Sequence, residues 1–166
     1  MSSDAIVLLK DDHKAILKAF RDFEDAGENA HKTKGDLVDK IIELLTVHTY
    51  LENEVMYPRV RELVPDLEDD VLESYEEHHV ADLLVMELTT MKPTDERFTA
   101  KTTVLIENVR HHIEEEEDEW FPQVREALGR KTLQEIGAEM EQARAQAPRK
   151  PSQPSALKKT IDAVIG

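Results

Sequence analysis

The sequence predicts an all-α fold: an up-down-up-down four-helix bundle with a short C-terminal helical extension. Apolar residues recur at helical spacing in four long segments. Glycine is scarce, with 5 residues in 166, and charged residues make up 34% of the chain, a profile that favours helix over sheet. Short connections join the segments, so consecutive helices are expected to lie antiparallel and side by side.

The boundaries of the helices follow from the positions of proline and glycine. Gly27 ends the first segment, Pro65 and Pro93 interrupt the chain further on, and Gly129 ends the fourth segment. His31 falls in the first connection. The four helices are therefore expected at residues 4–26, 36–63, 67–91 and 94–128.

Two prolines, Pro58 and Pro122, lie late in the second and fourth predicted helices. Each proline removes one helix hydrogen bond, because it has no backbone N–H group. We therefore expect a kink or an early end at both positions.

The C-terminal part differs in composition from the bundle. Residues 133–145 form a fifth amphipathic stretch, residues 147–156 are rich in proline, serine and basic residues, and residues 157–166 could form one short helix. We predict a bundle domain at 1–130 and an extension with linker and tail at 131–166. The tail either docks on the bundle or stays loose, and its sequence names no protein partner.

The composition excludes several classes of function. Thirty-six acidic residues face 21 basic ones, which gives a net charge of −15. Such a polyanion repels phosphate backbones and anionic lipid surfaces, so neither nucleic acid nor membrane is an expected partner. The chain has no cysteine, which excludes disulfides, thiolate catalysis and iron–sulfur clusters. With no signal peptide and no apolar stretch of membrane-spanning length, a cytoplasmic location is expected.

An internal repeat carries the functional signal. Residues 48–62 align with residues 112–126, which superposes His48 on His112, Glu52 on Glu116, and Tyr57-Pro58 on Phe121-Pro122. The first and third helices match as well, with Asp11-Asp12-His13 against Glu76-Glu77-His78. The bundle is therefore predicted to consist of two helical hairpins related by a pseudo-two-fold axis.

The repeat also decides between neighbouring histidines. Adjacent residues on a helix point about 100° apart, so one member of each pair faces a given site. The match to His13 selects His78 over His79, and the match to His48 selects His112 over His111.

The selected residues suit a pair of metal ions. His48 and Glu52, like their repeat partners, are four residues apart and so share one helix face. Both glutamates lie on apolar stripes, where an ionised carboxylate is costly unless it is paired or binds a metal. Each carboxylate could bridge two ions. His13 and His48 would serve one ion, and His78 and His112 the other.

The identity of the metal follows from the donor types. Two nitrogens and two oxygens per ion leave coordination positions for an oxo or hydroxo bridge and one small molecule. Mixed imidazole and carboxylate donors suit iron, manganese or zinc, and we rank manganese and zinc below two iron ions. Two competing patterns fit less well. The zinc-protease motif HExxH is absent, and the Glu-x-x-His motif of ferritin-like bundles occurs once, at Glu76–His79.

These residues resemble the hemerythrin family, and specifically the bacterial hemerythrin-like HHE cation-binding domains. The resemblance covers about residues 5–128. It rests on Asp12-His13, Glu77-His78 and the two His-x-x-x-Glu motifs, with Tyr57-Pro58 and Phe121-Pro122 behind them. It implies a hemerythrin-like four-helix bundle with a non-haem di-iron site, whose ligands are His13, His48, Glu52, His78, His112 and Glu116.

One departure from the family pattern is informative. Oxygen-carrying hemerythrins have a further histidine four residues after the one that matches His78, and this chain has Asp82 there. Asp82 is open to three interpretations: an extra ligand, a partner for an imidazole, or a solvated residue. In the oxygen-carrying hemerythrins the second bridging acid also follows the fourth-helix histidine by five residues, whereas in this chain Glu116 follows His112 by four. Simple oxygen storage is therefore not the expected function.

Three functions remain open at the sequence level. The leading hypothesis is a di-iron protein that binds or senses O2, NO or peroxide. The second is redox catalysis at the same site, for example peroxide decomposition. The third is iron storage or iron sensing, in which metal binding stabilises the bundle.

Overall fold

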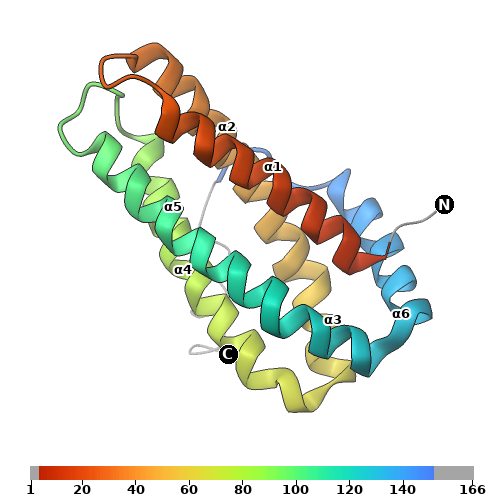
Figure 1. Cartoon of the computed structure of the whole chain (residues 1–166). Helices are drawn as coiled ribbons and strands as arrows, with labels where there is room; N and C mark the ends of the chain where they lie inside the picture. The colour runs from red at the N-terminus through yellow and green to blue at the C-terminus, as the bar shows by residue number, and fades with distance from the viewer. Residues whose placement is uncertain (1–3, 152–166) are drawn as a thin grey trace, which may run out of the picture.

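The computed structural model describes residues 4–151, which form a helical bundle (Figure 1). Its α-helices are α1 Ala5–Asp25, α2 His31–Leu51, α3 Tyr57–Leu63, α4 Glu68–Thr89, α5 Phe98–Glu115 and α6 Phe121–Arg144. Two π-helical segments, η1 Glu52–Met56 and η3 Glu116–Trp120, and one 3₁₀ turn, η2 Pro65–Leu67, lie between them. The predicted all-α bundle is confirmed.

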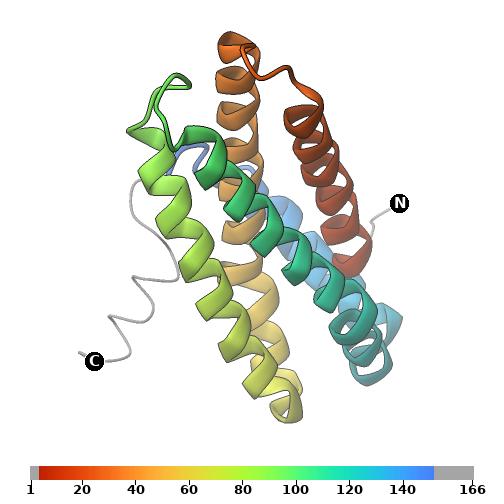
Figure 2. The ribbon, with the colours of Figure 1, turned by 60° about the vertical axis from the view of Figure 1, so that its left-hand side comes forward.

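Four long rods make up the bundle. α2, η1 and α3 follow one another without a break, as do α5, η3 and the start of α6. α1 packs on α2 to form the first hairpin, and α4 packs on α5 to form the second. Figures 1 and 2 show the two hairpins side by side, with consecutive rods antiparallel.

The buried apolar residues form two clusters, one toward each end of the bundle. We call them the extension-side cluster, which includes Leu9, Leu51 and Val71, and the loop-side cluster, which includes Ile16 and Leu45. α1 runs from the first cluster to the second and α2 runs back. α4 and α5 repeat this alternation. Each rod carries one buried histidine at the crossing between clusters, so the polar site divides the core.

The second rod begins at His31, earlier than the predicted start at residue 36. His31 therefore belongs to the first turn of α2 and not to the connection. Gly35 lies inside this helix at a point where the loop after α4 packs closely on it: an added Cβ would lie 2.7 Å from Pro93 Cγ. The fourth rod starts at Phe98, later than predicted.

Of the kink or early end expected at Pro58 and Pro122, the early end is wrong. Both rods continue through the prolines, and a π-helical turn directly precedes the turn that contains each proline. The Tyr57 N–H donates to Glu52 O, and the Phe121 N–H donates to Glu116 O, each across five residues. Such π-bulges insert an extra residue into the turn and change the direction of the side chains around it, often at functional sites.

The described part of the C-terminal extension, residues 131–151, packs on the bundle. At Gly129 the backbone adopts φ 76°, the left-handed region that glycine tolerates, and α6 then turns back along α1 and α2 (Figure 1). Leu133, Ile136 and Met140 are buried in the extension-side cluster. The division of domains at residue 130 stays a prediction, and the helix predicted at 157–166 lies outside the described residues.

Within residues 4–151, no helix is both long enough and apolar enough to cross a bilayer.

Candidate metal centre

The structure brings all six predicted ligands together in the interior, at the crossing between the two core clusters. The four histidines come from four different rods, and the two glutamates come from the π-helical turns. All six side chains are buried: His13, His48, Glu52, His78, His112 and Glu116.

Their donor atoms form two groups that share the glutamates. His13, His48, Glu52 and Glu116 each offer a donor atom within 4.8 Å of the others, and so do Glu52, His78 and His112. Glu116 also reaches the second group, because its Oε2 lies 3.2 Å from His112 Nε2. We call His13 and His48 the first half of the centre, and His78 and His112 the second half.

The distances between donor atoms fit metal coordination. Glu52 Oε1 lies 3.0 Å from His48 Nε2 and 3.2 Å from His78 Nε2, and Glu116 Oε1 lies 3.1 Å from His13 Nε2. Two ligand atoms bound at right angles, each about 2.1 Å from one ion, would be about 3.0 Å apart.

The same atoms lack hydrogen bonds that would explain their burial. Within residues 4–151, both Glu52 oxygens, Glu116 Oε1 and the Nε2 atoms of His13 and His48 are fully buried without a hydrogen-bond partner. The nearest groups to these carboxylates are the histidine nitrogens, and a buried carboxylate is costly unless it is paired or binds a metal. A cation between them would remove this cost, so the residues present fit a pair of metal ions.

Each histidine is oriented by a partner at its other ring nitrogen. His13 Nδ1 lies 2.6 Å from Glu117, His48 Nδ1 3.0 Å from Asp12, His78 Nδ1 2.9 Å from the Asn53 side-chain oxygen, and His112 Nδ1 3.4 Å from Glu77. An Nδ1–H donated to such acceptors leaves the Nε2 lone pair directed at the metal position.

The negative charge of the buried carboxylates favours positive charge on the groups around them. Burial alone lowers the pKa of His48, but Glu52 and Asp12 override it and raise that pKa to about 10. The pKa of His112 is likewise raised well above its ordinary value, since Glu116 and Glu77 outweigh its burial. The pKa of Glu52 lies well below its ordinary range despite burial, because His48 and His78 face it. The same field favours a metal cation.

The two halves of the centre are contacted by different aromatic side chains. The repeat pairs Tyr57 with Phe121. The Phe121 ring is stacked on His13, with centroids 5.8 Å apart. The Tyr57 hydroxyl instead points at the second half: it donates to Glu116 Oε2 at 2.7 Å and lies 3.3 Å from both His78 Nε2 and His112 Nε2. Burial and the charges of Glu116 and Glu52 raise the pKa of Tyr57 well above its ordinary value, so the phenol keeps its proton.

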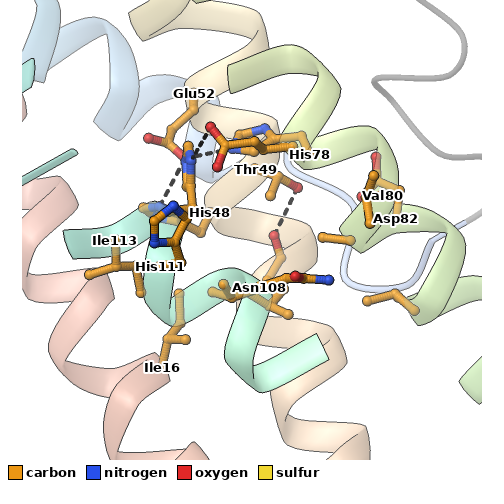
Figure 3. A pocket seen from close by; sticks show the side chains of 16 residues that line it. Ile16, His48, Thr49, Glu52, His78, Val80, Asp82, Asn108, His111 and Ile113 are labelled. Carbon is orange, nitrogen blue, oxygen red and sulfur yellow. Dashed lines mark hydrogen bonds and ion pairs between the residues drawn. The ribbon is translucent and has the colours of Figure 1, made fainter. Parts of the chain in front are cut away.

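An apolar cavity of about 150 Å³ reaches the centre between α2, α4 and α5. Figure 3 shows His48, Glu52 and His78 meeting on one side of it, with Ile16 and Asn108 further along. Most of the wall is apolar, including Leu45, Ala81, Val85 and Val109. His112 also lines this cavity, whereas His13 does not.

The rejected histidines lie outside the two donor groups. His111 is exposed and pairs with Glu115 at 2.9 Å, and His79 is half-buried. Asp82 is half-buried on the α4 wall of the cavity, and none of the three clusters of possible metal donors among the described residues includes it. This position favours a role at the cavity wall over one as a ligand.

Sequence reasoning did not assign the partners of the histidines or the Tyr57 hydroxyl. A signal was present, because the repeat pairs Asp12 with Glu77 and Asn53 with Glu117. These residues directly precede His13 and His78, or directly follow Glu52 and Glu116. The direction of their side chains depends on the π-helical turns and on contacts across the bundle, which the spacing does not encode.

Known proteins resemble this chain in sequence and in fold. The chain is 25% identical over 138 residues to a protein named DNA nickase from Nostoc sp., an alignment that covers 83% of this chain and 38% of that protein. A crystal structure of a hemerythrin HHE cation binding domain-containing protein from Mycobacterium kansasii has the same fold, with a TM-score of 0.70 and 21% identity. The match covers 87% of this chain and 86% of that one.

The family assignment rests on a match over most of the chain. Residues 4–124 match the description "Hemerythrin HHE cation binding domain". The matched region contains the first three rods, most of the fourth, and all six buried donor residues. The chain therefore belongs to the hemerythrin HHE cation-binding domain family.

Proposed function

We propose that this chain holds two iron ions and binds or senses a small ligand, O2, NO or peroxide, at the second half of its centre. The apolar cavity carries the proposal, because it leads to both histidines of the second half, His78 and His112, but to only one of the first half, His48. Four imidazoles and two bridging carboxylates give each ion two nitrogen and two oxygen donors, which leaves positions for other ligands. Iron would supply redox chemistry and exchangeable coordination positions, and we rank manganese and zinc below it.

The residues around the second half suit a small, weakly polar ligand. The wall formed by Ala81, Val85 and Val109 offers few groups to hold water, and an apolar lining with a few convergent polar groups is typical of ligand sites. The Tyr57 hydroxyl lies beside the donors of this half and can donate a hydrogen bond there.

The test is an optical spectrum of protein purified aerobically with iron. We expect absorption typical of a bridged di-iron centre that changes on addition of azide, peroxide or nitric oxide. The proposal would be contradicted if the protein lacked this absorption, or if none of these ligands changed the spectrum.

A cavity-filling variant tests the route. Ala81 lines the cavity and is buried, so Ala81→Phe should leave the iron content unchanged and slow ligand binding roughly tenfold. Ala100→Phe, on the exposed face of α5, is the matched control and should bind at the normal rate. Equal rates in both variants would exclude this cavity as the route.

Peroxide decomposition is a second candidate, favoured by the protonated Tyr57 hydroxyl 2.7 Å from Glu116. In that reaction one peroxide is reduced to water and a second is oxidised to dioxygen, and protons must be held and returned beside the ions. Peroxide consumption should fall in Tyr57→Phe and disappear in Glu116→Ala. Equal rates in wild type and Glu116→Ala would remove this candidate.

No nucleic acid partner enters the proposal. The protein named DNA nickase is matched over 38% of its length, and a net charge of −15 opposes contact with a phosphate backbone. Mixing the iron-loaded protein with DNA should give no shift in gel mobility.

A further inference from the structure

A second cavity reaches the centre from the other side of Glu77, and its chemistry is the opposite of the first. It has a volume of about 110 Å³ and lies between α4 on one side and α5 with η3 on the other. None of the described residues that line it is lysine or arginine. We call it the acidic vestibule, and its carboxylates are Asp70, Glu73, Glu77, Glu115, Glu116 and Glu119.

The carboxylates form a path from solvent to the interior. Asp70, Glu73 and Glu119 are exposed, and Glu77 and Glu115 are half-buried. Carboxylate oxygens of Glu73, Glu77 and Glu115 lie within 4.8 Å of one another, close enough to share one cation. Glu115 also contacts His111 at 2.9 Å, and Glu77 contacts His112 Nδ1 at 3.4 Å.

The inner end of the path provides independent support for a cation ligand. Glu116 lines the vestibule and is 3% exposed. Its Oε2 lies 3.2 Å from His112 Nε2, and its Oε1, which has no hydrogen-bond partner in the described chain, lies 3.1 Å from His13 Nε2. His112 also lines the vestibule, so the path ends on two donors of the second half. A buried carboxylate with an unpartnered oxygen calls for a cation or a proton.

We propose that the acidic vestibule is an outer cation site, which captures a hydrated divalent cation at Glu73, Glu77 and Glu115 and delivers it to Glu116 and His112. Carboxylate oxygens bind hard, hydrated cations, and clefts lined by one sign of charge raise the local cation concentration and the rate of association. The apolar cavity is unsuited to this task, because a cation loses its hydration there without compensation. The inference rests on the proposed metal centre and adds separate routes for the cation and for the small ligand.

The test uses Glu73→Gln/Glu115→Gln, which removes two charges from the vestibule and leaves all six inner donors intact. Glu135→Gln/Glu141→Gln removes two charges from exposed positions on α6 and is the matched control. Stopped-flow uptake of Co²⁺ or Fe²⁺ by metal-free full-length protein should be roughly tenfold slower in the vestibule variant, with a weaker dependence on salt. The final content of two ions should be unchanged.

Trp120 gives a direct readout of the outer site. It lines the vestibule and is the single tryptophan of the chain. Tb³⁺ bound by the outer carboxylates should therefore luminesce when Trp120 is excited, and the vestibule variant should lose this signal while the α6 control keeps it.

The outcomes separate the two proposals. Uptake at the wild-type rate together with unchanged Tb³⁺ luminescence in the vestibule variant would overturn the outer site and leave the inner centre standing. Wild-type protein that binds no cation at the inner donors would instead overturn the proposed function. Equal melting temperatures for the two charge variants would show that neither effect comes from unfolding.

Discussion

The two halves of the metal centre share one repeat, yet their surroundings differ at three points. The first half has carboxylate partners on both imidazoles, Glu117 on His13 and Asp12 on His48, whereas His78 in the second half has the amide of Asn53. The Phe121 ring covers His13, whereas the Tyr57 hydroxyl reaches the second half. His112 lines both the apolar cavity and the acidic vestibule, whereas in the first half His48 lines the apolar cavity alone and His13 lines neither.

The two halves of the centre are therefore expected to differ in function. A carboxylate on Nδ1 makes an imidazole a stronger donor than an amide does, since it increases the basicity of the ligand. The first half is therefore expected to hold its cation more tightly. The second half, which is reached by both cavities and has a hydroxyl at its donors, is expected to exchange cations and meet small ligands.

The largest effect is expected from Glu116→Ala, because Glu116 lies 3.1 Å from His13 in the first half and 3.2 Å from His112 in the second. Loss of this bridge should reduce the metal content from two ions per chain to one or fewer. Metal analysis after expression with iron is the measurement, and Glu114→Ala, at an exposed neighbouring position, is the control. Two ions retained in Glu116→Ala would mean that the halves do not share this carboxylate.

Removing one histidine from each half should rank the two sites. His78→Ala and His13→Ala are each expected to retain one ion. The ion left in His78→Ala occupies the first half, so a chelator about 10–100-fold stronger should be needed to remove it than in His13→Ala. Chelator competition measures this difference, and the opposite order would reverse the assignment of tasks.

An exchange of one partner should make the halves more alike. Asn53→Asp gives His78 the carboxylate partner that the repeat provides at Glu117, so we expect the weaker ion to bind about tenfold more tightly. Asp12→Asn is the matched change in the first half and should weaken the tighter ion by a similar factor. Chelator titrations of both variants give the measurement. An unchanged affinity in both would show that these partners orient the rings without tuning them.

The smallest effect is expected at the extension. Arg144 on α6 donates to Asp12 at 3.0 Å, but its side chain is 37% exposed, so Arg144→Met should lower the free energy of unfolding by less than about 1 kcal/mol. Asp12 keeps its contact with His48, so metal affinity should change much less than in Asp12→Asn. Thermal unfolding and chelator titration check both points. An effect as large as that of Asp12→Asn would mean that docking of the extension controls the first half.

Helix periodicity alone predicted the bundle, because burying one stripe per helix is a local requirement that each segment records in its own residues. Two of the errors lie at a glycine and a proline, where the usual signals for the end of a helix did not apply. Gly35 lies inside α2 at a point where Pro93 leaves no room for a Cβ atom, and the second rod continues past Pro58 directly after a π-helical turn. A pattern of apolar residues contains neither fact.

The sequence by itself determined the fold class, the family resemblance and the six candidate ligands, since the repeat placed His and Glu in register on apolar stripes. Those residues stay predicted as ligands until a metal is measured, although the structure brings all six together. The tertiary structure alone decided which partner each imidazole has, that Tyr57 faces the second half, and that two unlike cavities meet at His112. These features join side chains from different rods, and their distances are set by packing across the bundle rather than by spacing along one helix.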